Sequence, residues 1–83
     1  MKHATSEALD QLEVLLNELR ELAYLKEKKR GIFYIKSRAF LHFHEDPSGL
    51  FADVRLKHDF ERFPVNTEVQ QHRLLKKIMI VLA

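Results

Sequence analysis

The sequence predicts an α+β fold of two layers, in which helices pack on one face of an antiparallel meander sheet in the order α-β-β-β-β-α. Residues 6–29 form a leucine-rich amphipathic segment, residues 32–65 alternate apolar runs with turn signals, and residues 67–82 have a second helical pattern. With 83 residues and no cysteine, the chain is expected to form a single domain, residues 1–83, without disulfides or thiolate metal sites.

The first expected element is one long helix over residues 6–29. Thr5 or Ser6 can cap it, and Gly31 can end it in the left-handed conformation. Its apolar stripe has leucines at three- and four-residue spacing, namely Leu9, Leu12, Leu16 and Leu19. A helix of this length measures about 36 Å, against about 23 Å for a seven-residue strand, so it is expected to overhang its sheet.

Four antiparallel strands are expected next, at residues 32–36, 39–45, 50–56 and 60–65. The run Asp46-Pro47-Ser48-Gly49 suits a type I turn, so the second and third strands should form a hairpin. A four-residue loop places His42 opposite Asp53, whereas a glycine bulge would shift the register by one residue and separate them. Pro64 marks the last strand as an edge strand.

The chain is expected to end in a helix over residues 67–82. Thr67-Glu68-Val69-Gln70 has the pattern of a capping box, which marks the start of a helix. The tail from Ile78 to Leu82 is apolar on every side, so a further strand is the alternative to the favoured helix.

The predicted register leaves large apolar side chains on both faces of the sheet. One face, with Leu41 and Phe43, should pack on the helices, and the opposite face would carry Phe33, Ile35, Phe40 and Phe51. Such an apolar face marks an interface, unless the second helix covers it within one chain. We therefore predict a non-enzymatic binding or assembly domain that acts as a homodimer. Its interface would combine these four residues with Leu9, Leu12, Leu16 and Leu19.

A second hypothesis is a metal site on the hairpin. His42 and His44 are two residues apart on a strand, so both point to one face, and Asp53 can join them from the partner strand. Two imidazoles and a carboxylate form a ligand set that zinc or iron uses, with a possible hydrolytic or redox role. The alternative interpretation is a cross-strand histidine–aspartate pair that stabilises the hairpin. His3, His58 and His72 are expected to be scattered and exposed.

A third hypothesis is weak nucleic-acid binding through five cations, Lys28, Lys29, Arg30, Arg38 and Arg55. The net charge of +2, from 14 basic and 12 acidic residues, is small for such a role. The run Lys26–Arg30 also suits the carboxyl end of a helix.

Several classes of protein find no support in the sequence. With no cysteine and only two glycines, the chain shows neither a cysteine nucleophile nor a glycine-rich phosphate loop. Charged residues within the leucine-rich stretch exclude a membrane span there. The absence of an export signal, together with the absence of cysteine, predicts a cytoplasmic protein.

The hairpin residues His42, His44, Ala52, Asp53 and Leu56 resemble a His-x-His and Ala-Asp-x-x-Leu pattern. Small uncharacterised bacterial domains with the nominal label "luciferase domain" carry this pattern. The resemblance covers residues 31–82 and implies that the hairpin characterises the fold, without implying luciferase activity. The chain departs from these domains by being shorter after Leu56 and by lacking a tryptophan-containing strand.

A looser similarity links the chain to the MmcQ/YjbR-like proteins, which are nominally DNA-binding. It rests on Glu27-Lys28, Gly31, Phe33 and the strand meander.

Overall fold

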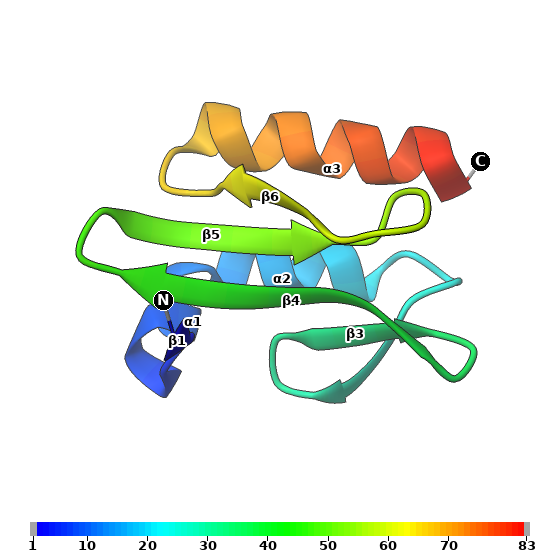
Figure 1. Ribbon diagram of the computed structural model, residues 1–83, viewed down its shortest axis with the longest axis horizontal. Coiled ribbons are helices and arrows are strands. Elements are labelled where there is room, and N and C mark those ends of the chain that lie inside the picture. The colour runs from blue at the N-terminus through cyan, green and yellow to red at the C-terminus, as the bar shows by residue number, and fades with distance from the viewer. Residues whose placement is uncertain (1, 83) are drawn as a thin grey trace.

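The computed structural model describes residues 2–82 and confirms the α+β class (Figure 1). The strands form an antiparallel sheet of order β2-β3-β4-β5-β6, and β1 pairs with β4 outside this path. Helices α2 and α3 lie on the same side of the sheet (Figure 1). The elements in chain order are β1 (Lys2–His3), α1 (Ser6–Gln11), α2 (Glu13–Arg20), β2 (Lys26–Lys29), β3 (Ile32–Ile35), β4 (Arg38–Asp46), β5 (Gly49–Val54), β6 (Glu61–Pro64) and α3 (Glu68–Leu82).

The predicted long helix over residues 6–29 is wrong. Two short helices, α1 and α2, meet at Leu12, and α2 ends at Arg20. The following lysine-rich run forms β2, an edge strand paired with β3, and Gly31 makes the β2–β3 turn with φ +80° instead of ending a helix. The longest dimension of the molecule is 33 Å. A straight helix of about 36 Å would be longer than the whole molecule. The chain instead turns back after Arg20, which keeps its apolar residues over the sheet.

Two arginines tie the β2 edge to the helices. Arg20 of α2 donates to Glu13 at 2.8 Å and to Glu27 of β2 at 3.0 Å. Arg30 donates to Asp10 and to Glu13, each at 2.8 Å. These ion pairs hold the run Lys26–Arg30 against α1 and α2. The run is therefore an edge strand and a turn, and not the carboxyl end of a helix as the sequence suggested.

The central hairpin has the predicted register. β4 and β5 pair with His42 opposite Asp53 and with Glu45 opposite Leu50. In the turn, the Asp46 carboxylate accepts a hydrogen bond from the backbone N–H of Ser48 at 2.8 Å, which closes the loop locally. The hairpin therefore brings the predicted site residues together as expected.

The elements after the hairpin also confirm the prediction. β6 is an edge strand on β5 and ends at Pro64. The capping box forms, because Gln70 N–H donates to Thr67 Oγ1 at 3.1 Å and Thr67 N–H donates to Gln70 Oε1 at 3.2 Å. Helix α3 then continues to Leu82, so the apolar tail is helical. None of the helices within residues 2–82 combines the length and the apolar character needed to cross a membrane.

The pairing of β3 with β4 differs from the expectation and moves Phe33 into the core. Ile35 lies opposite Arg38, so the tight turn starts one residue earlier than predicted. A β-bulge with Phe40 as its extra residue follows, and Phe33 then lies opposite Leu41. Because side chains alternate along a strand, this shift turns Phe33 to the face that carries Leu41.

The core lies between this face and the helices, and it contains most of the residues predicted for a dimer interface. Six of them are buried within the single chain: Leu9, Leu12, Leu16, Leu19, Phe33 and Phe40. Ile35 and Phe51 are half-buried. The assignment of the six buried residues to an exposed interface is wrong, because the chain covers them itself. The homodimer stays a prediction without this support.

Candidate metal-binding site

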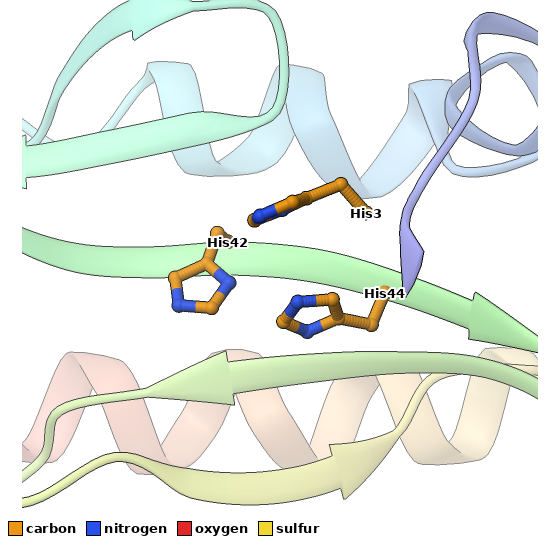
Figure 2. A group of neighbouring side chains, drawn as sticks. All are labelled: His3, His42 and His44. Carbon is orange, nitrogen blue, oxygen red and sulfur yellow. The ribbon is translucent and has the colours of Figure 1, made fainter. Parts of the chain in front are cut away.

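Three histidines lie together on the side of the sheet away from α2 and α3 (Figure 2). His42 and His44 are two residues apart on β4, so their side chains leave the same face. β1 pairs with β4 beside them, and His3 is directly opposite His44. The N-terminal strand thus adds a third imidazole to the pair that the sequence predicted.

Hydrogen bonds of the N-terminal segment fix the position of His3. β3 pairs with the first part of β4, and β1 pairs with the later part. After β1, the backbone N–H of Ala4 donates to the carbonyl oxygen of Phe43 at 3.0 Å. The N–H of Thr5 donates to the carboxylate of Glu45. These contacts, and not the ring alone, hold the third histidine in place.

The three rings contact one another. The ring centroids are 4.7 Å apart for His3 and His44, 4.8 Å for His42 and His44, and 5.7 Å for His3 and His42. One nitrogen of each ring can be chosen so that all three atoms lie within 4.8 Å of one another. Tetrahedral zinc, with Zn–N bonds of about 2.0–2.1 Å, needs its ligand nitrogens roughly 3.3 Å apart. An ion would therefore draw the rings inward by on the order of 1 Å.

Burial favours the neutral form of two of these histidines. Nδ1 of His42 and Nδ1 of His44 are buried, and neither has a hydrogen-bond partner among residues 2–82. Desolvation lowers the pKa of His42, and the nearby His44 lowers it further; desolvation also lowers the pKa of His44. Neutral imidazole is the form that binds metals, so both side chains are prepared for ligation.

Asp53 lies opposite His42 as predicted, but its carboxylate is engaged elsewhere. Arg62 of β6 donates from Nε to Oδ1 and from Nη2 to Oδ2, each at 2.8 Å, and these bonds lower the pKa of Asp53. Oδ2 is also 3.0 Å from Nδ1 of His44, although the ring is not aligned for a hydrogen bond. The cluster of possible ligands therefore contains His3 in place of Asp53, which lies behind His44.

An aromatic ring lies against one member of the cluster, His42. Phe60, in the β5–β6 connection, has its ring centroid 4.9 Å from that of His42. The guanidinium of Arg55 lies 4.4 Å from the Phe60 ring centroid and donates to the carbonyl oxygens of Ala39 and His58 at 3.2 Å each. Phe60 thereby helps to desolvate His42, and Arg55 is engaged within the chain.

The other cations predicted for nucleic-acid binding occupy different surroundings. Arg30 is paired with carboxylates of α1 and α2, and Lys28 lies 4.6 Å from the ring centroid of Tyr34. Lys29 and Arg38 are exposed, on β2 and at the start of β4 respectively. The nucleic-acid hypothesis stays a prediction.

Sequence reasoning missed His3 and Arg62. His3 belongs to a segment too short to show a strand pattern, so the sequence gives no signal of its pairing with β4. Arg62 could have been found, because a strand over residues 60–65 was predicted and its pairing places Arg62 opposite Asp53.

Comparisons with models of known protein families, with curated proteins and with solved structures found no match to the chain. The similarities to the domains labelled as luciferase domains and to the MmcQ/YjbR-like proteins stay predictions. The fold and the site define an α+β protein with a three-histidine cluster on one sheet face. Its function is therefore argued from the site itself.

Proposed function

We propose that this protein binds a divalent transition-metal ion, with zinc as the first choice, through His3, His42 and His44. One observation carries the proposal: a nitrogen from each of the three imidazoles lies within 4.8 Å of the other two. Imidazole nitrogen is a common ligand for zinc, and three protein ligands leave a fourth position of a tetrahedral ion to water or a small ligand.

The alternative interpretation, a structural histidine–aspartate pair, explains less of the site. A contact between His44 and Asp53 accounts for one ring only. It leaves the buried Nδ1 of His42 without a partner among residues 2–82 and gives no role to His3. Buried polar atoms are nearly always paired, so an unpaired nitrogen next to two other imidazoles supports metal ligation by His42.

Asp53 and Arg62 complete the proposed site from behind. Because Nδ1 of His44 faces Asp53 at 3.0 Å, Nε2 is the nitrogen left for the ion. A carboxylate that accepts a hydrogen bond from the far nitrogen of a ligating imidazole fixes its tautomer and raises its basicity, and the inward shift of the rings on metal binding would align His44 for that bond. Arg62 holds both carboxylate oxygens, so the orientation of Asp53 is set before metal binds. Asp53 is thus proposed as a positioning residue and not as a ligand.

Calorimetric titration of metal-free protein with zinc chloride tests the proposal. We expect one zinc ion per chain. His3→Ala, His42→Ala and His44→Ala should each weaken this binding, because each variant leaves only two imidazoles. Asp53→Asn should weaken zinc binding about 10- to 100-fold, the usual effect of removing a partner behind a ligand.

Matched controls come from the same chain. His58 and His72 are exposed and lie outside the cluster, so His58→Ala and His72→Ala should leave the zinc affinity unchanged. His44→Gln and circular dichroism separate a lost ligand from a lost fold. Zinc binding of equal affinity in the wild-type protein and in His42→Ala would contradict the proposal, as would no binding at micromolar protein.

A second candidate function, self-association, is favoured by other residues than those predicted. Tyr24 and Met79 line one surface hollow between the α2–β2 connection and α3. Ile80 and Val81 are also exposed, and Ile80 is 75% exposed. We propose that the chain forms a homodimer that buries these apolar residues. Sedimentation velocity should then show a dimer that Ile80→Lys converts to a monomer, whereas a wild-type monomer at all concentrations would exclude the homodimer.

The cytoplasmic location stays a prediction.

A further inference from the structure

A hollow of about 430 Å³ is lined by residues of the β3–β4 turn, the start of β4, Arg55, Leu56 and Val81 near the end of α3. The β3–β4 turn and the C-terminal end of α3 lie at the same end of the molecule (Figure 1). The walls of the hollow are apolar and come from Ile35, Phe40, Leu56 and Val81. Its rim is the turn at residues 36–38. Hollows of this size with apolar walls and a few polar groups are typical of small-molecule sites.

The rim carries positive charge. Lys36 and Arg38 are exposed, and neither takes part in the ion pairs formed among residues 2–82. The residues that line the hollow include no aspartate or glutamate. Arg55 also lines it, but its guanidinium already donates to carbonyl oxygens of Ala39 and His58. Two cations therefore remain to meet an anionic group.

Two backbone irregularities shape this end of the sheet. Phe40 is the extra residue of the β-bulge on β4, and bulges redirect side chains. Lys36 has a φ of +56°, a conformation that glycine adopts readily and lysine does not. Residues held in unfavourable backbone conformations cluster at ligand sites. The bulge gives the hollow an aromatic wall, and the turn fixes a lysine at its rim.

We propose that this hollow binds a small amphipathic carboxylate. Its apolar chain would lie against Ile35 and Leu56, and its carboxylate would lie between Lys36 and Arg38. Burial of the chain supplies affinity, and charge-assisted hydrogen bonds from the rim select the charged head group. The hollow is at the beginning of β4, whereas His3 pairs near its end, so the two proposed sites share no ligand-binding residue.

A titration of metal-free, nitrogen-15-labelled protein with decanoate, followed by amide chemical shifts, tests the proposal. Decanol is the matched probe, because it has the same chain and no charge. We expect decanoate to shift the amides of residues 35–40, 55–56 and 81, and to bind at least tenfold more tightly than decanol.

Charge-removing variants identify the head-group contacts. Lys36→Gln and Arg38→Gln should each weaken decanoate binding about tenfold, the effect of one lost charge-assisted hydrogen bond, and leave decanol binding unchanged. Lys36→Gly removes the same charge while suiting the positive φ, so it guards against a folding defect. Lys29→Gln, an exposed lysine of β2, is the control and should have no effect.

Three outcomes would overturn the proposal. Equal affinities for decanoate and decanol would mean that the chain adsorbs to apolar surface without recognition of its head group. Shifts centred on the exposed α3 residues Met79 and Ile80 would place binding elsewhere. No amide shift at millimolar decanoate would exclude a site.

Discussion

Truncation of Phe33 distinguishes a core residue from an interface residue. The side chain is 0% exposed in the single chain and belongs to the central cluster, with Leu41 opposite it on β4. Removing a buried phenylalanine side chain to alanine costs about 3–5 kcal/mol, as transfer and cavity terms add. A domain of this size has a stability of about 4–12 kcal/mol in total. Phe33→Leu, with an expected loss of about 1–2 kcal/mol, is therefore the more measurable variant.

The assay is urea unfolding of wild type and Phe33→Leu, followed by circular dichroism at two protein concentrations that differ tenfold. Because the core contact lies within one chain, the loss of stability should be the same at both concentrations. In thermal unfolding, the melting temperature should fall by about 4–8 °C for each kcal/mol of stability lost. Val14→Ala is the control: Val14 is 72% exposed. Such surface changes alter stability by no more than about 0.5 kcal/mol.

Two results would refute this reasoning. A loss from Phe33→Leu as small as that from Val14→Ala would show that Phe33 is not in the core. The second result is a wild-type stability that depends on protein concentration, with this dependence lost in Phe33→Leu. It would show that Phe33 lies in the dimer interface that the sequence suggested.

Three further predictions concern pH, a turn and the N-terminal strand. Folding lowers the pKa of His42 and of His44, so near and below a pH of about 6.5 the unfolded chain binds more protons than the folded chain. The free energy of unfolding, measured in urea, should therefore fall as the pH drops from about 7 to about 5. A rise in the free energy of unfolding would contradict the burial of these rings. Gly49 has a φ of +132°, and a methyl group there would overlap the Asn66 side-chain oxygen that accepts a hydrogen bond from Leu50 N–H. Gly49→Ala should therefore lower the free energy of unfolding in urea by about 1–3 kcal/mol. An unchanged urea midpoint would be evidence against this turn. One equivalent of zinc should slow hydrogen exchange at the amides of Ala4 and Thr5, and equal exchange rates with and without zinc would show that His3 does not ligate.

The sequence predicts an element correctly where its local signals agree with the pairing in the folded structure. The turn from Asp46 to Gly49 and the alternation on both sides of it set the hairpin register, and Thr67 with Gln70 marked the start of α3. These elements form from contacts between residues close in the chain, so propensity and pattern identify them.

Other elements depend on contacts that the sequence does not display. The run from Lys26 to Lys29 has strong helix formers, yet pairing with β3 makes it a strand, because tertiary contacts override propensity. A bulge at Phe40 shifts β3 by one residue and moves Phe33 to the core. The candidate site was found only in part, because His3 reaches it through long-range pairing with His44.

The central claim, that three imidazoles of this chain bind one metal ion, is tested most directly by NMR of the histidine ring nitrogens. In long-range proton–nitrogen spectra, one equivalent of zinc should shift one ring nitrogen each of His3, His42 and His44, with Nε2 as the ligand of His44. The rings of His58 and His72 should not change. If zinc leaves the ring nitrogens of His42 and His44 where they are, or shifts all five histidines alike, the proposed site does not exist.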